Sequence, residues 1–150
     1  MTRLYDQHVV LLMDADALVG MDLEDTMERA GYRVLGPLAT TLEALSLLER
    51  ETPTLAIIDV VLRDGPCFVL VQELRRRGVP FLVHTGCEPN APMAGEFLGA
   101  PWLNKPALST DVVTLCAELA LTKPNLAPDR QILPPIVLSR SGGGCEPLVP

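Results

Sequence analysis

Short apolar runs alternate with helix-length segments along most of this chain, and this alternation constrains the fold more than any other feature of the sequence. The runs are rich in Val, Leu and Ile, which suit buried strands. Strands that alternate with helices are typical of a parallel sheet with helices on both faces. With 150 residues, the chain is long enough for one such domain with a real core. The sequence therefore predicts a doubly wound α/β domain.

A polar side chain stands at the end of each of four predicted strands. In chain order these residues are Asp14, Asp59, Thr85 and Lys105. Because the carboxyl ends of parallel strands meet at one edge of an open sheet, we expect the four side chains to lie close together. Two carboxylates, a hydroxyl and an ammonium in one place predict a ligand site at that edge.

Helices are predicted between the strands from apolar spacing and end signals. Thr40 and Glu43 fit a capping box, in which a hydroxyl and a carboxylate accept hydrogen bonds from free backbone N–H groups. Residues 86–92 contain too much proline and glycine for a full helix, so the fourth helix is predicted to be short or irregular, within residues 93–98. The other predicted helices are 17–30, 67–77 and 109–121.

Charge and hydropathy exclude some classes of function. The formal net charge of −7 argues against nucleic-acid binding, which needs a basic surface. The basic run at residues 75–77 is expected to cap a helix. No apolar run approaches the ~20 residues that cross a bilayer, and the N-terminus does not resemble a signal peptide. We therefore expect a cytoplasmic protein with no nucleic-acid or membrane partner.

The last part of the chain differs in composition from the rest. Prolines recur through residues 123–150, which also contain three consecutive glycines. Such a segment cannot hold a regular helix and has little apolar surface to bury. The sequence predicts one domain over residues 7–121 and a flexible tail over residues 122–150, with no output domain.

A set of short motifs in a fixed order gives this chain a resemblance to a known family. They are Met13-Asp14-Ala15-Asp16, Asp59, Thr85-Gly86 and Lys105-Pro106, each at the end of a predicted strand. Over roughly residues 7–121 the chain resembles a response regulator receiver domain of two-component signalling. The resemblance implies a flavodoxin-like, five-stranded parallel sheet in the order 2-1-3-4-5. It also implies a stand-alone signalling module that is not an enzyme.

The resemblance assigns a role to each residue of the predicted site. Asp59 would take a phosphoryl group from a histidine kinase or a phosphotransfer protein, forming an aspartyl phosphate. A Mg²⁺ ion would bridge Asp59, Asp14 and the backbone carbonyl of Val61. The phosphate-binding and switch residues would be Lys105, Thr85, Gly86 and Trp102, the last at the position of the family's switch aromatic. The output would be docking to a downstream effector protein.

One expected acid is missing from this site. The second member of the family's acid pair, normally a direct metal ligand, aligns with Ala15. Even the loss of an outer partner of a metal ligand typically costs ~10–100-fold in metal affinity, so Mg²⁺ binding should be weakened. Asp16 would replace the lost carboxylate only if the loop rearranged. The degenerate fourth helix alters the family's usual output and dimer surface, so a homodimer stays an open alternative.

Two other functions remain open on the sequence alone. One is a pseudo-receiver, which would bind partner proteins whatever its phosphorylation state. The other is a haloacid dehalogenase-like phosphatase, because Asp14-Ala15-Asp16 also fits the D-x-D motif of those enzymes. There Asp14 would be the nucleophile and Asp16 the acid/base, with Thr85 and Lys105 on the phosphate. The further metal-binding acids of such enzymes have no clear counterpart after the lysine.

Overall fold

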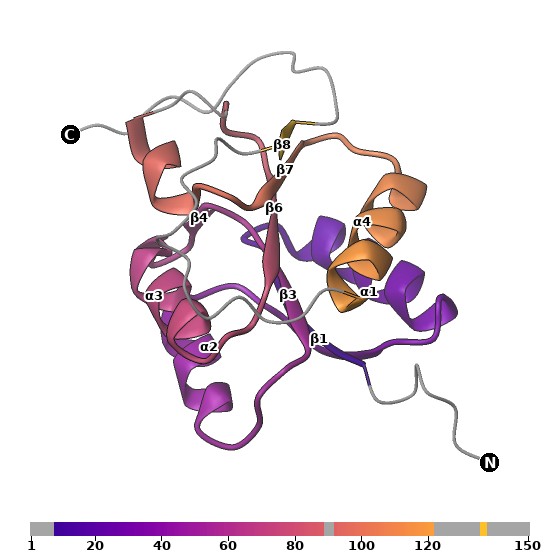
Figure 1. The fold of residues 1–150 in the computed structure, drawn as a ribbon, viewed down its shortest axis with the longest axis horizontal. Helices are drawn as coiled ribbons and strands as arrows, with labels where there is room; N and C mark the ends of the chain where they lie inside the picture. Colours follow the sequence, from indigo (N-terminus) through magenta and orange to yellow (C-terminus); the bar gives the residue numbers. More distant parts are fainter. Residues whose placement is uncertain (1–7, 89–91, 122–135, 138–150) are drawn as a thin grey trace.

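The computed structural model describes residues 8–88, 92–121 and 136–137. A parallel sheet forms its centre, in the strand order β2-β1-β3-β6-β7-β8 (Figure 1). The strands are β1 (Val9–Met13), β2 (Arg33–Leu38), β3 (Leu55–Ile58), β6 (Phe81–Thr85), β7 (Pro101–Asn104) and β8 (Ile136–Val137). The first five follow the predicted order 2-1-3-4-5, which is confirmed.

The sheet also has a sixth strand that the sequence did not predict. β8 lies within the segment predicted as a tail and pairs in parallel with β7, with Pro101 opposite Ile136 and Trp102 opposite Val137. Residues 122–135 and 138–150 lie outside the described part of the chain. The domain boundary and the flexibility of the tail therefore stay predictions.

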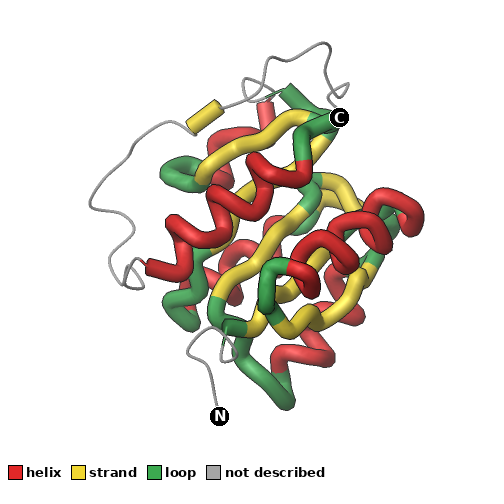
Figure 2. Tube along the Cα trace, turned by 90° about the vertical axis from the view of Figure 1, so that its right-hand side faces the viewer, coloured by secondary structure: helices red, strands yellow, loops and turns green. Residues whose placement is uncertain are grey.

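Helices cover both faces of the sheet, as predicted (Figures 1 and 2). They are α1 (Ala17–Arg29) and α4 (Ser109–Leu121) on one face, and α2 (Thr41–Leu48) and α3 (Phe68–Arg76) on the other. The fourth helix is only a short 3-10 helix, η2 (Pro92–Phe97), which confirms the irregularity expected there. In the described ranges, no helix is long and apolar enough to cross a membrane.

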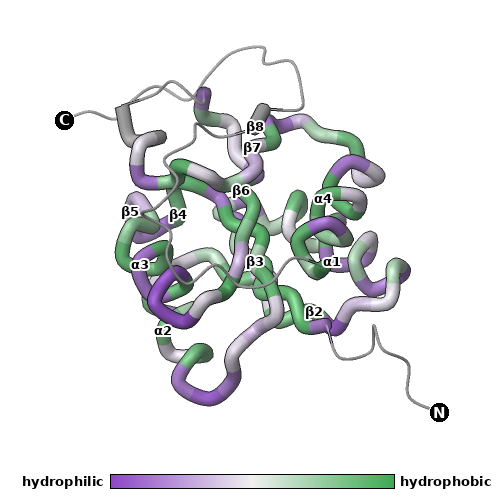
Figure 3. Tube along the Cα trace, viewed as in Figure 1, coloured by the Kyte–Doolittle hydropathy of each residue, from purple (hydrophilic) through white to green (hydrophobic). Residues whose placement is uncertain are grey.

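Alternate side chains of the central strands enter the two halves of the core. In β1, Leu11 and Met13 pack in the half that contains α2 and α3, whereas Val10 and Leu12 pack in the half that contains α1 and α4. Successive side chains of a strand point to opposite faces, which explains this division. Figure 3 shows hydrophobic residues along the central strands, as expected for a parallel sheet buried on both faces. Polar groups are consequently concentrated at the strand ends.

A close approach between β1 and β2 positions the first site residue. Gly36 has a φ of +118°, and a Cβ built on it would lie 2.5 Å from the Leu12 carbonyl oxygen, so only glycine fits there. β2 continues past Gly36 and ends at Leu38. The Leu38 carbonyl accepts a hydrogen bond of 2.9 Å from the Asp14 N–H. This bond holds the Asp14 backbone at the end of the sheet.

The predicted capping box is present at the start of α2. The Thr40 hydroxyl accepts from the Glu43 N–H (3.1 Å), and the Glu43 carboxylate accepts from the Ala39 N–H (3.2 Å). The Asp64 carboxylate accepts from the first two amides of α2, at 2.9 and 3.2 Å. Asp64 lies in a small antiparallel hairpin that follows Asp59, formed by β4 (Val61–Leu62) and β5 (Gly65–Pro66). Hydrogen bonds therefore attach this hairpin to the start of α2.

The basic run at residues 75–77 binds groups of the protein itself. Arg76 and Arg77 form ion pairs with Glu73, each with an N–O distance of 2.6 Å. Arg75 donates to the carbonyls of Glu96 and Leu98, at 3.3 and 3.1 Å. The contacts of Arg75 attach α3 to the segment around η2.

Candidate functional site

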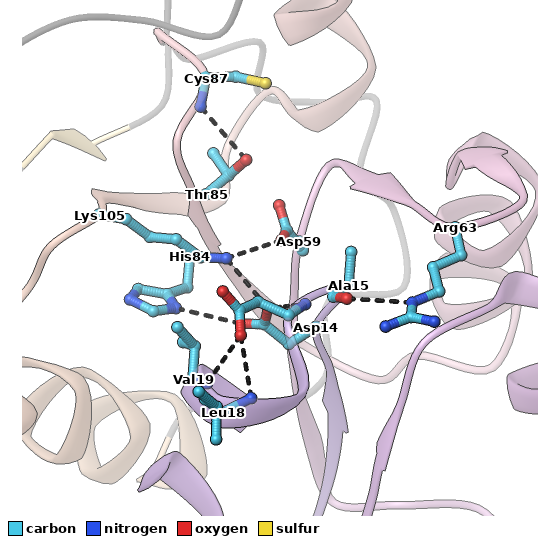
Figure 4. Close-up of polar contacts among 11 residues, drawn as sticks. Asp14, Ala15, Leu18, Val19, Asp59, Arg63, His84, Thr85, Cys87 and Lys105 are labelled. Carbon is cyan, nitrogen blue, oxygen red and sulfur yellow. Dashed lines mark hydrogen bonds and ion pairs between the residues drawn. The ribbon is translucent and has the colours of Figure 1, made fainter. Parts of the chain in front are cut away.

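Lys105 lies between two buried carboxylates at the carboxyl edge of the sheet. Its Nζ atom is 2.9 Å from Asp59 Oδ2 and 3.1 Å from Asp14 Oδ1 (Figure 4). Asp14 follows β1, Asp59 follows β3 and Lys105 follows β7. The two aspartates are only 2% and 6% exposed, respectively. The fold thus brings three of the four predicted strand-end residues into one ion-pair cluster.

The environment of this cluster keeps Lys105 charged. Burial alone would lower the pKa of the Lys105 ammonium, but the nearby charges of Asp59 and Asp14 outweigh it and the pKa is raised. Burial raises the pKa of the Asp14 carboxyl, although the hydrogen bond from the Asp16 N–H and the charge of Lys105 act against it. The cluster therefore presents a permanent cation to Asp59.

The two acids at residues 14 and 16 point to different partners. Asp14 Oδ1 accepts a hydrogen bond from the Asp16 N–H at 2.8 Å, in addition to the contact with Lys105. The Asp16 carboxylate instead caps α1, because it accepts from the N–H groups of Leu18 (2.9 Å) and Val19 (3.3 Å). The structure does not bring Asp16 to the cluster. To replace the acid lost at position 15, it would have to leave the helix end.

His84 is a second buried neighbour of Asp14. Its Nδ1 lies 4.0 Å from Asp14 Oδ2, and neither atom has a hydrogen-bond partner among the described residues. Burial, followed by the charge of Lys105, lowers the pKa of His84 to about 4. The imidazole is therefore neutral at neutral pH.

Because of this depressed pKa, we expect His84 to make the fold sensitive to acid. The unfolded chain binds a proton on this residue below pH 6.5, whereas the folded chain does so only near pH 4. As the pH falls between these values, stability should drop by about 2–3 kcal/mol. Urea unfolding at about pH 7 and about pH 4.5 measures this loss, which His84→Leu should abolish. Equal losses in the two proteins would contradict the assignment to His84.

Position 15 has a partner that the sequence did not indicate. The Ala15 carbonyl accepts a hydrogen bond of 3.2 Å from Arg63 Nε. The Arg63 N–H in turn donates to the Ala39 carbonyl at 2.9 Å. Arg63 lies in the loop that follows Asp59. No sequence signal could have suggested this contact, because it joins two loops 48 residues apart.

Thr85 and Gly86 stand where the fourth central strand ends. Thr85 is 1% exposed, and its hydroxyl oxygen accepts a hydrogen bond from the Cys87 N–H at 3.3 Å. A Cβ built on Gly86 would meet nothing within 4 Å, so there is open space beside Thr85. The predicted phosphate-binding role of these two residues stays a prediction.

Trp102 is fully buried in the core half that contains α3. Its ring packs edge-on against Phe97, with centroids 5.9 Å apart and planes at 82°. The indole N–H donates to the Cys87 carbonyl at 3.2 Å, and the Asn104 amide donates to the same carbonyl at 2.7 Å. The sequence analysis did not single out Asn104. These bonds hold the backbone that follows Thr85, while the predicted switch role of Trp102 stays a prediction.

Few protein ligands are available for a metal ion. In the described part of the chain, no three His, Cys, Asp or Glu side chains form a group that could hold one. Asp14 Oδ2 is buried and lacks a hydrogen-bond partner among the described atoms. Asp59 lies beside it across Lys105, and Val61 begins the hairpin that follows Asp59. A metal ion would therefore meet two carboxylates at most before any loop movement.

Part of this sequence is similar to a known regulatory protein. No protein-family model matches the sequence. Over 58 residues the chain is 38% identical to the transcriptional regulatory protein PdtaR of Mycobacterium tuberculosis. That match covers 37% of this chain and 28% of PdtaR, so the chain matches less than a third of the length of that regulator.

Several solved structures have a similar fold. A Chloroflexus aurantiacus protein assigned as a response regulator has a TM-score of 0.67 and 28% identity, over 77% of this chain and 98% of that one. A CheY-like receiver domain protein from Methanospirillum hungatei has a TM-score of 0.67 and 25% identity, over 75% and 93%. The chemotaxis response regulator CheY4 of Vibrio cholerae, at 24% identity over 75% and 98%, shares the fold with a TM-score of 0.65.

The chain has the fold of CheY-like receiver domains, with two aspartates and a lysine at the carboxyl edge of its doubly wound sheet. The chain is similar in fold to response regulator receiver domains, and over 58 residues its sequence is similar to the regulator PdtaR. Receiver domains are generally signalling modules rather than enzymes, they bind Mg²⁺, and they work with histidine kinases and effector proteins.

Proposed function

We propose that this receiver accepts a phosphoryl group on Asp59 from a histidine kinase or a phosphotransfer protein and then docks to an effector protein. The observation that carries the proposal is the Lys105 ammonium, 2.9 Å from Asp59 Oδ2 at the carboxyl edge of the sheet. A fixed cation beside the acceptor offsets the charge of an incoming phosphoryl group. The similarity to PdtaR and to response regulator structures supports the same function.

The transfer step makes one bond and breaks one. An Asp59 oxygen attacks phosphorus, the P–N bond of the phosphohistidine breaks, and its electron pair returns to the imidazole nitrogen. Oδ2 of Asp59 already accepts from Lys105, and Oδ1 has no hydrogen bond to a described residue, so we infer that Oδ1 attacks. Lys105 then neutralises a phosphoryl oxygen, and the Thr85 hydroxyl is the nearby donor for another.

Part of the donor set for Mg²⁺ is present. We propose that the ion would be held by three oxygens: Oδ2 of Asp14, which has no hydrogen-bond partner among the described residues, the Asp59 carboxylate and the Val61 carbonyl. Mg²⁺ often binds through one or two carboxylates together with water and phosphate oxygens, so this reduced set fits a weak site. The bound ion would offset charge on the phosphoryl oxygens. Ala15 leaves the set one carboxylate short, and Asp16 is held at the helix end.

Intact-mass measurement with acetyl phosphate and Mg²⁺ tests the proposed function. The wild-type protein should gain one phosphoryl group, and Asp59→Asn should gain none. Mass is a sharper readout than fluorescence, because Trp102 is already fully buried. No gain in the wild-type protein at saturating donor and Mg²⁺ would contradict phosphoryl acceptance.

Restoring the missing acid should strengthen Mg²⁺ binding. We expect Ala15→Asp to bind Mg²⁺ roughly 10–100-fold more tightly than the wild-type protein, by analogy with the loss caused by removing partners of a metal ligand. Calorimetric titration measures this change. Ala17→Asp is the matched control. Ala17 is exposed in the first turn of α1, and this substitution adds the same charge as Ala15→Asp. Equal affinities for the two variants would place the metal away from position 15.

A second candidate function is a pseudo-receiver that binds partners without phosphorylation. The observation that favours it is the double hydrogen bond between the Asp16 carboxylate and α1, which keeps this acid from replacing the one lost at Ala15. In that case the protein would not gain mass, and Asp59→Asn would bind its partner as tightly as the wild type. A partner affinity that changes upon phosphorylation would exclude this alternative.

A further inference from the structure

Arg63 contacts the position of the site at which an acid is missing. Its Nε donates to the Ala15 carbonyl at 3.2 Å, and Figure 4 shows the guanidinium on the other side of Ala15 from Lys105. The terminal nitrogens of Arg63 have no hydrogen bond to a residue in the described ranges, and the side chain is exposed. A cation with unused donors therefore stands at the rim of the candidate acceptor site.

The backbone of Arg63 is fixed while its side chain reaches this rim. The Arg63 N–H donates to the Ala39 carbonyl at 2.9 Å. The next residue, Asp64, accepts hydrogen bonds from the first two amides of α2. β4 and β5 pair on either side of this turn. The loop is thus anchored at both ends. Among the described residues, a single hydrogen bond, from Nε to the Ala15 carbonyl, restrains the guanidinium group.

The charges of the site indicate what a cation here does. When ionised, Asp14 and Asp59 carry two negative charges, and Lys105 offsets one of them. The carboxylate of Asp16 is bound by the first amides of α1. Arg63 offsets the charge that remains. If position 15 carried an acid, the site would have one more negative charge, and a divalent cation would be needed to neutralise it.

We propose that Arg63 is the second cation of the acceptor site. Its guanidinium anchors the Ala15 carbonyl and also binds an oxygen of the anionic phosphoryl donor, so that transfer to Asp59 depends less on Mg²⁺. Guanidinium groups suit this task because their planar donors bind phosphate oxygens in pairs and stay charged at all physiological pH values. This inference rests on the proposed function and assigns a donor-binding residue to the same site.

Donor binding without divalent cations tests the contact separately from phosphorylation. In an Asp59→Asn background, which cannot be labelled, acetyl phosphate is titrated in EDTA and followed by amide chemical shifts. Arg63→Gln should raise the Kd about tenfold, the usual effect of losing one hydrogen bond to a charged group. Arg50→Gln is the matched control, because it removes an exposed arginine from the end of α2 and should leave the Kd unchanged. Equal Kd values for the two variants would overturn the proposal.

Labelling rates test the consequence for Mg²⁺ dependence. With the Asp59 carboxylate intact, acetyl phosphate labelling is compared in EDTA and in Mg²⁺. Arg63→Gln should label about tenfold more slowly than the wild type in EDTA, with a smaller difference in Mg²⁺. Arg63→Lys keeps the charge but not the paired donors, so its labelling rate in EDTA should lie between those of the wild type and Arg63→Gln. Wild-type labelling that vanishes in EDTA would overturn the reduced Mg²⁺ dependence.

The two measurements separate this inference from the proposed function. If no protein is labelled under any condition but donor binding still depends on Arg63, phosphoryl acceptance fails and the anion contact stands. If the wild type is labelled and neither readout depends on Arg63, the proposed function stands and the role of Arg63 is refuted.

Discussion

Replacement of Lys105 by methionine is expected to slow phosphorylation of Asp59 by roughly 10²–10³-fold, the usual effect of removing one preorganised donor from a developing charge. Methionine keeps most of the apolar stem but removes the ammonium that lies 2.9 Å from Asp59 and 3.1 Å from Asp14. The incoming phosphoryl group then meets two carboxylates with no cation between them. The rate of mass gain with acetyl phosphate measures the effect.

The same variant should also change how stability depends on pH. Without Lys105, burial acts on Asp14 with less opposition, so the pKa of this carboxyl rises further. A carboxyl with a raised folded-state pKa destabilises the fold while it is ionised, and this cost disappears as the pH falls through that pKa. Lys105→Met should therefore be less stable than the wild type at neutral pH and recover in acid.

Arg50→Met is the control for the loss of one positive charge, because Arg50 is exposed and lies at the end of α2. It should label at the wild-type rate. If Lys105→Met also labels at that rate, Lys105 has only a structural role, and the ammonium is not part of the acceptor chemistry.

Replacement of Trp102 by alanine is expected to destabilise the domain by about 3–5 kcal/mol, the usual cost of truncating a buried aromatic residue. The ring is 0% exposed and packs edge-on against Phe97. Its loss leaves a cavity between β7 and η2, and it removes one of the two donors to the Cys87 carbonyl. Urea unfolding followed by circular dichroism measures the change, since the variant has no tryptophan left to fluoresce.

Trp102→Phe separates packing from hydrogen bonding. Phenylalanine keeps much of the contact with Phe97, and the Asn104 amide still donates to the Cys87 carbonyl at 2.7 Å. The loss should then be about 1 kcal/mol, as expected for one hydrogen bond. A similar loss in the alanine and phenylalanine variants would mean that the ring contributes little through packing.

The candidate site was partly predictable because strand ends are visible in the sequence. Asp14, Asp59 and Lys105 each follow an apolar run, and parallel pairing of those runs brings them together. Arg63 was not predicted, because its contact with Ala15 joins residues 48 positions apart along the chain and depends on the path of the loop after Asp59. No local pattern encodes such a path.

The role of Asp16 is a second feature that the sequence did not settle. On the sequence, Asp16 was a possible replacement metal ligand only if its loop rearranged, and its role as a helix cap was not predicted. The structure has it as the cap, because the first amides of α1 lie 2.9 and 3.3 Å from its carboxylate. Free N–H groups at a helix start attract a carboxylate wherever one is within reach. The competing metal role would need a loop movement.

The sequence alone determined the fold class, the order of the five main strands and the polar residues at their ends, since these follow from hydrophobic periodicity and from motifs that are local in the chain. Four features became visible only in the folded chain: Lys105 bridges both carboxylates, Arg63 reaches Ala15, Trp102 is fully buried and β8 extends the sheet. These features depend on distances between segments far apart in the chain, which become defined only when the sheet and its loops pack together.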